Sequence, residues 1–329
     1  AGSRELGELV EPAVSLAENG FVLDSYALSR YERALEALGQ DPPSARIYFR
    51  DDGSPLREGD LLEQPDLAET YRRIGKEGSD YFYRGEFARR LAAYMEAKGG
   101  LITLADMRDY RAVVREPVVG SYRDYTVFGM PPPSSGGVHV IQILNLLEVS
   151  RILEGRSGWD SHSVLWTSRF MSRVFEDRAA YLGDSDFIPV PVDRLTSRAY
   201  AEEILTGMIK RKAAPAVVSD SDGAARPEGG HTTSFIVLDR AKNVVAVNQT
   251  VNLNYGAKIT LPGTGVILNN EMDDFSARPG RPNAFGLVGS EANAIEAGKR
   301  PLSSMSPTII VKDGRPCLLY TSPSPRDKF

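Results

Sequence analysis

The segment His231-Thr232-Thr233-Ser234-Phe235-Ile236-Val237-Leu238 decides how this chain is interpreted, because two kinds of sequence meet in it. Residues 213–231 are rich in Pro, Ala, Ser, Asp and Gly without apolar periodicity, which predicts an exposed linker. The run that follows Thr232 predicts a buried strand. A threonine hydroxyl needs a neighbouring base to act as a nucleophile, and the α-amine of an N-terminal threonine can be that base. The layout suggests a precursor that cuts itself between His231 and Thr232. On these residues alone, a threonine that merely begins a strand is the plainer interpretation.

The chain before this junction is mostly helical in its pattern. Apolar side chains recur at helical spacing in three stretches, residues 86–97, 138–147 and 160–182. Thr103 is a predicted helix N-cap, with Asp106 three residues later. Short strands are expected between these helices, at residues 113–114, 118–119 and 125–128.

The chain after the junction is rich in strands. Residues 235–238 and 244–247 are apolar on both faces and are separated by Asp239 to Asn243, which predicts a hairpin. Strands that are apolar on both faces need cover on both sides, and the helices of the first region are available for it.

Composition is that of an ordinary globular protein of 329 residues, with 42% hydrophobic and 25% charged residues. A net charge of −5 offers no basic face for nucleic acid, and no apolar run approaches the roughly 18 residues that span a bilayer. The three histidines, His139, His162 and His231, lie far apart and outside any triad or zinc motif. We expect neither a metal nor another cofactor.

Four motifs give the chain a resemblance to the gamma-glutamyltransferase (glutathione hydrolase) family of N-terminal-nucleophile hydrolases. The resemblance runs from about Gly7 to Pro316. It rests on four stretches in the family's order and spacing: Met130-Pro131-Pro132-Pro133-Ser134-Ser135-Gly136-Gly137, His231-Thr232-Thr233, Asn269-Asn270-Glu271-Met272-Asp273-Asp274-Phe275-Ser276, and Lys299-Arg300-Pro301-Leu302-Ser303-Ser304-Met305-Ser306-Pro307-Thr308. The fold that this resemblance implies is α/β (α+β), a four-layer αββα sandwich.

The resemblance also implies two subunits made from one precursor, which stay together as a heterodimer. Residues 1–231 would form the C-terminal part of the large subunit and end in the linker 213–231. Residues 232–316 would form the N-terminal part of the small subunit, with a lid loop at 279–288. A periplasmic or secreted location is implied in the same way.

Site residues carry over position by position from the family pattern. Thr232 falls on the catalytic threonine, and Thr250 on the threonine that hydrogen-bonds it. The remaining matches fall on positions that hold the charged ends of a γ-glutamyl group: Asn252, Glu271, Asp274, Ser303 and Ser304. Carboxylates suit an ammonium, and hydroxyls and amides suit a carboxylate. Taken singly, each of these residues would be an ordinary turn, loop or strand residue.

Two positions depart from the common family pattern. Ser234 stands where many members carry His, and Phe285 in the lid stands where many bacterial members carry Tyr. We therefore expect that the hydrogen bond that closes the lid is missing.

We expect that neither end of this sequence is a natural end of the protein. Residues 317–329, which include the only cysteine, Cys317, do not continue the family pattern and resemble a translated sequencing adapter. The family's oxyanion-hole glycines would follow Pro316, and its substrate-binding arginine would precede Ala1. As written, the chain is therefore expected to be inactive.

The activity implied is transfer of a γ-glutamyl group from glutathione or another γ-glutamyl amide to water or an amino acid, through an ester on Thr232. One alternative is a cephalosporin (glutaryl) acylase of the same family. Glu271 and Asp274 argue against it, because a glutaryl group has no ammonium. The other alternative is an unprocessed, non-catalytic relative that binds γ-glutamyl compounds.

Overall fold

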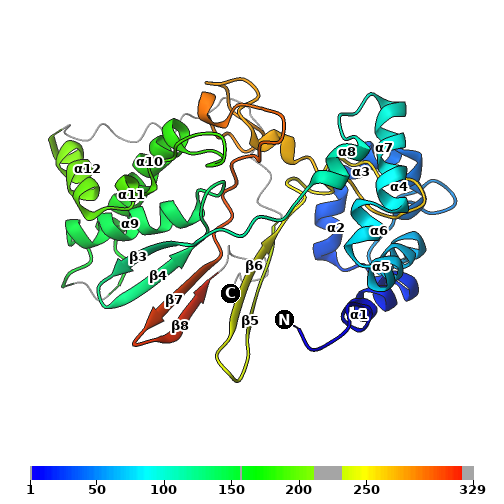
Figure 1. Cartoon of the computed structure of the whole chain (residues 1–329), viewed down its shortest axis with the longest axis horizontal. Helices are drawn as coiled ribbons and strands as arrows, with labels where there is room; N and C mark the ends of the chain where they lie inside the picture. Colours follow the sequence, from blue (N-terminus) through cyan, green and yellow to red (C-terminus); the bar gives the residue numbers. More distant parts are fainter. Residues whose placement is uncertain (1, 156–157, 211–231, 321–329) are drawn as a thin grey trace. The chain divides into compact units, whose positions relative to one another are not determined.

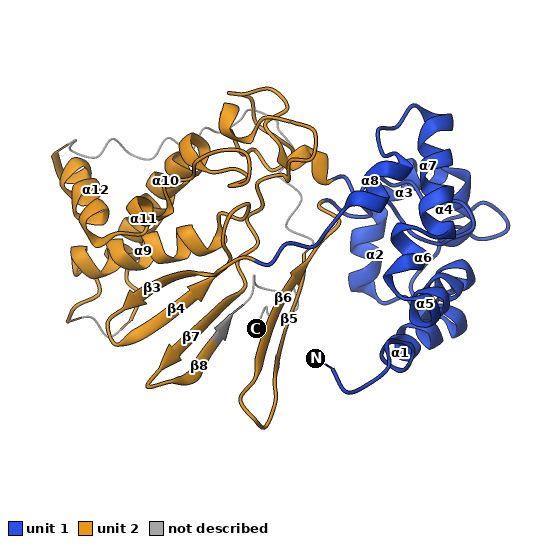
Figure 2. Ribbon diagram, viewed as in Figure 1, with its two compact units in different colours: residues 1–114, 253–270 blue, residues 115–252, 271–329 orange. Residues whose placement is uncertain are grey.

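The computed structural model describes residues 2–155, 158–210 and 232–320, which divide into two compact units (Figures 1 and 2). Unit 1 comprises residues 1–114 and 253–270, and unit 2 comprises residues 115–252 and 271–329. The two compact units and the two predicted subunits are different divisions of the chain. A segment from beyond the predicted cut, residues 253–270, folds with the helical first third of the chain.

Unit 1 is built from short helices around small apolar clusters. Its elements are α1 (Leu6–Asn19), β1 (Phe21–Val22), α2 (Ser25–Tyr31), α3 (Leu35–Gln40), α4 (Pro42–Tyr48), β2 (Leu61–Leu62), α5 (Pro65–Glu77), α6 (Ser79–Tyr83), α7 (Glu86–Lys98) and α8 (Leu104–Asp109). Buried polar contacts tie residues 253–270 to these helices. The Thr260 N–H donates to the Asp41 carboxylate over 3.0 Å, and the Thr70 hydroxyl donates to the Thr264 carbonyl over 2.8 Å.

Unit 2 centres on a four-stranded antiparallel sheet in the order β3-β4-β7-β8. The strands are β3 (Val118–Tyr122), β4 (Tyr125–Gly129), β7 (Thr308–Lys312) and β8 (Arg315–Tyr320). Strand β7, from beyond the predicted cut, pairs with β4 from before it. Strand β8 runs through Pro316, so pairing continues past the residue at which the family pattern was expected to end.

Helices cover one face of this sheet (Figure 1). Helix α9 (Gly136–Ser150) packs on β3 and β4, and α10 (Ser161–Tyr181) and α12 (Arg198–Lys210) pack on α9, with the short α11 (Val192–Leu195) beside them. Side chains such as Val127, Ile141 and Phe170 form the buried core between sheet and helices.

Most of the predicted helices and strands are confirmed. Helix α7 ends at Gly99, whose φ of 70° is the left-handed cap conformation that glycine favours. Thr103 caps α8 in a capping box with Asp106. The strand expected at residues 113–114 is wrong: these residues pair with no strand of the described ranges, and Val114 is exposed.

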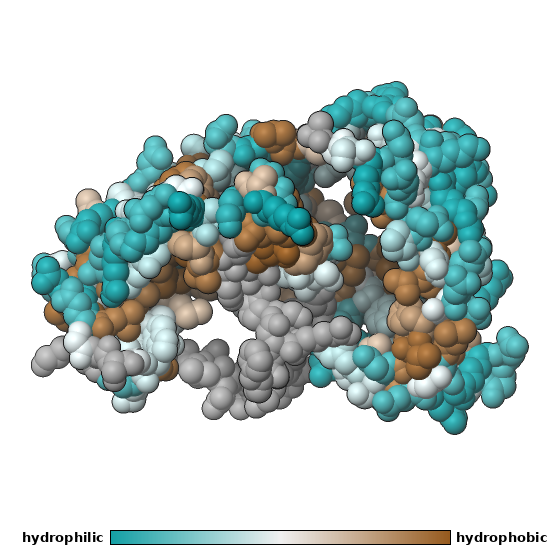
Figure 3. Space-filling view, turned by 90° about the horizontal axis from the view of Figure 1, so that it is seen from below, coloured by the Kyte–Doolittle hydropathy of each residue, from teal (hydrophilic) through white to brown (hydrophobic). Residues whose placement is uncertain are grey.

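The predicted hairpin is present, but its predicted burial is wrong. Strands β5 (Thr233–Leu238) and β6 (Val244–Gln249) pair with each other as a separate two-stranded sheet. Phe235, Val237 and Val245 are 45%, 54% and 55% exposed, because the helices of unit 2 cover the other sheet. Figure 3 shows several apolar patches, in brown, open on one face of the molecule. An apolar sequence pattern predicts that a strand favours burial, but it does not identify the element that will cover the strand.

Candidate functional site

The two predicted catalytic threonines lie at the same end of the β5–β6 hairpin. Thr232 immediately precedes β5, and Thr250 immediately follows β6. Thr233 pairs with Gln249, so the next position on each strand sets Thr232 opposite Thr250. Both are half-buried. The Thr250 hydroxyl accepts the N–H of Asn252 over 3.0 Å, and His231 lies outside the described residues.

Asn252 turns the chain sharply after this hairpin. It is buried and has a φ of 74°, a left-handed conformation that asparagine tolerates better than most residues. Ser234, which departs from the common family pattern, lies on β5 opposite Asn248 of β6. Its hydroxyl oxygen accepts a hydrogen bond from the Asn248 side-chain amide over 2.8 Å.

Glu271 and Asp274 form a half-buried acidic pair on one turn of 3₁₀ helix, η2 (Glu271–Asp274). Burial raises the pKa of Glu271 to about 7, and the charge of Asp274 adds to the shift. Burial likewise raises the pKa of Asp274 to about 6, against the opposing effect of the Arg178 guanidinium. Two carboxylates that repel each other in a partly desolvated turn favour a cation between them. An ammonium group meets that need.

Arg178, on α10, supports this turn and was not predicted from sequence. Its side chain is buried, and burial lowers its pKa to about 10 while Asp274 acts in the opposite direction. One of its terminal nitrogens donates to the Leu302 carbonyl over 3.1 Å, one residue before Ser303. The available signal was a lone arginine within the apolar stripe of residues 160–182.

Asn293, in η3 (Glu291–Asn293), joins the same two segments and was also missed. Its side-chain amide donates to the Asp274 carbonyl over 2.8 Å, and its side-chain oxygen accepts the Leu302 N–H over 3.0 Å. A buried amide that satisfies two backbone groups fixes their separation. The acidic turn and the serine loop are therefore held together by two independent side chains, Asn293 and Arg178.

The predicted serine pair lies on a loop that is hydrogen-bonded to the motif at residues 130–137. The Ser135 N–H and hydroxyl both donate to the Ser303 carbonyl, over 2.9 and 3.1 Å, and the Ser303 N–H donates to the Pro133 carbonyl over 2.9 Å. The Ser303 hydroxyl oxygen accepts the Met305 N–H over 3.0 Å, which leaves its proton available for donation. Ser304 is exposed. The motif at residues 130–137 thus supports the loop that carries Ser303.

The predicted lid, residues 279–288, folds back on itself. The Gly280 N–H donates to the Gly289 carbonyl over 2.9 Å, and the Asn283 side-chain oxygen accepts the N–H groups of Phe285 and Leu287, each over 3.0 Å. A cavity of about 300 Å³ lies between the tip of this loop and α10, with Phe175, Arg178 and Leu287 in its wall. Phe285 is half-buried.

His139 and the acidic side chains are further candidates for reactive or metal-binding groups. His139 is buried on α9, and burial lowers its pKa to about 3, so it is neutral. The described ranges contain no group of three or more His, Cys, Asp or Glu side chains that could hold a metal ion. Nor do they contain a helix long and apolar enough to cross a membrane.

Comparison with known proteins identifies the class and then the family. The structure of Helicobacter pylori gamma-glutamyltranspeptidase superposes with a TM-score of 0.59 at 35% identity, covering 68% of this chain and 66% of that one. The fold is therefore the α+β fold of the N-terminal-nucleophile hydrolases. The sequence model described as gamma-glutamyltranspeptidase matches residues 1–323. The chain belongs to the gamma-glutamyltranspeptidase family.

Curated relatives include both hydrolases and acylases. The glutathione hydrolase proenzyme of Escherichia coli is 43% identical over 324 residues, covering 98% of this chain and 55% of that protein. The acylase ACY 1 proenzyme of a Pseudomonas species is 39% identical over 315 residues, covering 95% of this chain and 53% of that protein. The chain thus spans about half the length of the curated relatives it matches.

Proposed function

We propose that the protein is a self-processing gamma-glutamyltransferase and glutathione hydrolase with Thr232 as its nucleophile. The acidic pair Glu271 and Asp274 carries the proposal, because two half-buried carboxylates on one helical turn favour a positively charged ligand group. A γ-glutamyl group brings an ammonium to such a pair. Its α-carboxylate needs donors, which the hydroxyls of Ser303 and Ser304 and the amide of Asn252 provide.

The first step of the proposed mechanism is cleavage of the precursor. The Thr232 hydroxyl attacks the His231 carbonyl, the peptide C–N bond breaks, and the chain is left as an ester with a free α-amine on Thr232. Water then hydrolyses the ester, which releases the His231 carboxylate and restores the hydroxyl. The two resulting subunits remain associated.

Catalysis reuses the same hydroxyl in two acyl transfers. The Thr232 α-amine, whose pKa in model peptides is about 7.7–8.0, takes the hydroxyl proton as the oxygen attacks the γ-amide carbonyl. The C–N bond breaks, the proton passes to the departing amine, and a γ-glutamyl ester remains. Water or an amine acceptor then attacks this ester and regenerates the hydroxyl. Thr250 positions the nucleophile by a hydrogen bond.

The test is the Thr232→Ala variant of the full-length protein, compared with Thr233→Ala. Intact-mass spectrometry should show two pieces divided between His231 and Thr232 in the unmodified protein and one uncut chain in Thr232→Ala. Hydrolysis of γ-glutamyl-p-nitroanilide by Thr232→Ala should fall at least about 10³-fold, as expected for loss of a nucleophile. Thr233→Ala, an exposed neighbour of the same type, should be cut and active. Cleavage of the Thr232→Ala chain at this bond would overturn the mechanism.

The acylase alternative is kept because the ACY 1 proenzyme is nearly as similar as the hydrolases. It predicts faster hydrolysis of glutaryl-p-nitroanilide than of γ-glutamyl-p-nitroanilide. A non-catalytic γ-glutamyl-binding relative would remain a single chain that still binds glutamate. Export to the periplasm or the medium also belongs to the proposal, and fractionation of cells that express the full-length gene tests it.

A further inference from the structure

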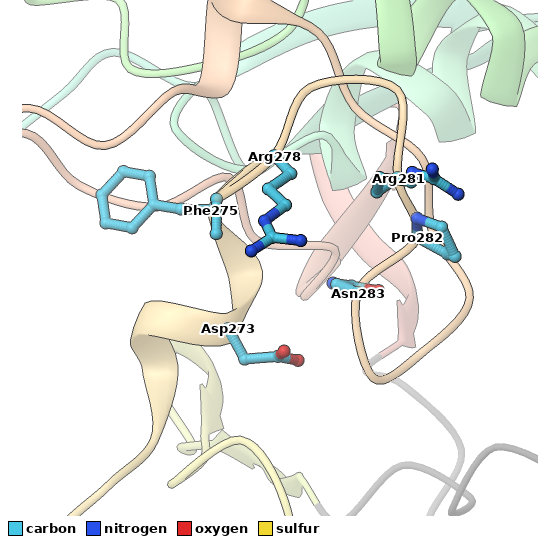
Figure 4. A pocket seen from close by; sticks show the side chains of 7 residues that line it. Asp273, Phe275, Arg278, Arg281, Pro282 and Asn283 are labelled. Atoms are coloured by element: carbon cyan, nitrogen blue, oxygen red, sulfur yellow. The ribbon is translucent and has the colours of Figure 1, made fainter.

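A second cavity lies against the acidic turn, on the side of the lid. It has a volume of about 200 Å³, and Figure 4 shows the side chains around it. Asp273 forms one wall, and Asn283 lies across from it. The Arg278 guanidinium is turned toward the side of Asp273, whereas the Arg281 side chain is turned outward. All of these residues belong to unit 2.

Backbone hydrogen bonds organise this cavity. The Arg281 N–H donates to the Arg278 carbonyl over 2.9 Å, so the two arginines flank one tight turn. Across the cavity, the Asp273 carboxylate accepts the N–H of Ala284, with oxygen distances of 3.1 and 3.3 Å. The Asp273 carboxylate therefore already accepts a hydrogen bond from the lid backbone.

The guanidinium groups of Arg278 and Arg281 differ from Asp273 in this respect. Neither Arg278 nor Arg281 forms an ion pair or hydrogen bond through its side chain with another described residue. Many other arginines of this chain do: Arg50, for example, contacts Asp60, and Arg115 contacts Asp186. Two unengaged guanidiniums against one engaged carboxylate give the cavity a net positive charge, which favours an anion.

The position of the cavity indicates which part of a substrate it would meet. Asp273 is the immediate neighbour of Asp274, whose carboxyl we assign to the γ-glutamyl ammonium. The cavity thus adjoins the γ-glutamyl site and lies outside the residues assigned to that group. What lies next to the γ-glutamyl group in a substrate is the amine that it is attached to.

We propose that Arg278 binds the carboxylate of this amine component, either the peptide that leaves or the amino acid or peptide acceptor that replaces it, and that the positive charge of Arg281 adds to the attraction. The proposal rests on the function proposed above. Guanidinium groups bind carboxylates with two parallel N–H···O bonds, so a ligand with a free carboxylate is preferred over its uncharged amide. Because both arginines are exposed, we expect a preference of about 3- to 10-fold.

The kinetic test compares glycylglycine with glycylglycinamide as acceptors for the γ-glutamyl group of γ-glutamyl-p-nitroanilide. The Arg278→Ala/Arg281→Ala double variant should raise the KM for glycylglycine about 3- to 10-fold and leave the KM for the amide unchanged. A parallel comparison of glutathione with γ-glutamyl-p-nitroanilide as donors tells whether the leaving peptide uses the same contact. Arg240→Ala is the matched control, because Arg240 is an exposed arginine in the turn between β5 and β6.

A double variant that still distinguishes the charged acceptor from the neutral one as the unmodified protein does would overturn the inference. Saturation-transfer NMR with glycylglycine and glycylglycinamide provides a readout that needs no turnover. Stronger transfer to glycylglycine, lost in the double variant, supports the carboxylate site even if the unmodified protein has no γ-glutamyl activity. Equal transfer to both compounds, in an enzyme that is active, would leave the proposed function standing and remove this inference.

Discussion

At the scale of single residues, the charge state of Glu271 and Asp274 affects the stability of the folded protein. Their pKa values in the folded protein, about 7 and about 6, lie above the ordinary values of 4.5 and 3.8. The folded state therefore binds protons more tightly than the unfolded state. The pair contributes full stability at acidic pH, and this contribution is lost as the pH rises through about 4 to 7.

Glu271→Gln tests this sign, because glutamine imitates the protonated acid. The variant should unfold at the same temperature as the unmodified protein at pH 4, where the carboxyl is protonated in the folded state and largely protonated in the unfolded state. At pH 8 its Tm should be about 2–4 °C higher, the shift that roughly 1 kcal/mol produces in chains of moderate size. Melting curves recorded by circular dichroism at both pH values check the prediction. An equal Tm at pH 8 would mean that Glu271 carries no penalty as a carboxylate.

At the scale of elements, the support beneath the serine loop depends on close backbone approach. A Cβ added at Gly136 would lie 2.4 Å from the Met305 carbonyl oxygen, and backbone cannot yield as a flexible side chain does. Gly136→Ala must therefore push the loop that carries Ser303 away from α9. Through this loop, the displacement would also reach the substrate site proposed above.

We expect Gly136→Ala to lower the free energy of unfolding by roughly 1–3 kcal/mol, the usual cost of overpacking. Gly207→Ala is the matched control. Gly207 lies within α12 with no atom near its would-be Cβ, so alanine there should raise stability by about 0.5–1 kcal/mol. Urea denaturation of both variants measures the difference. A stable Gly136→Ala protein with normal KM would show that the loop can move at little cost.

Elements were predictable where local signals are strong, and less so where partners are distant. The caps Thr103 and Gly99 were predictable because their partners lie within one helical turn. Residues 113–114 have strand-like sequence but pair with no strand that the structure describes, which no local pattern reveals. The same limit applies to the site. The acidic and serine positions followed from the motif resemblance. Arg178, in contrast, hydrogen-bonds Leu302, which is 124 positions away in the sequence, and no local sequence pattern predicts the partner of such a distant contact.

At the scale of the whole molecule, each compact unit draws on sequence from both sides of residue 232. Unit 1 takes in residues 253–270, and the sheet of unit 2 hydrogen-bonds β7 to β4. If the chain is cut between His231 and Thr232, each unit still contains parts of both pieces. The pieces should therefore co-elute in gel filtration without any covalent link, and separate only in denaturant.

The pairing of β4 with β7 across the predicted cut has a consequence for refolding. While the chain is intact, β4 and β7 meet at the high effective concentration that a tether provides. After cleavage, an unfolded molecule must rebuild the same sheet by a bimolecular encounter. Recovery of the cut protein from urea should thus fall as the protein is diluted, whereas recovery of the uncut Thr232→Ala chain should not depend on concentration. Cleavage would then be irreversible in practice, and the lifetime of the folded, cut protein would depend on how slowly it unfolds.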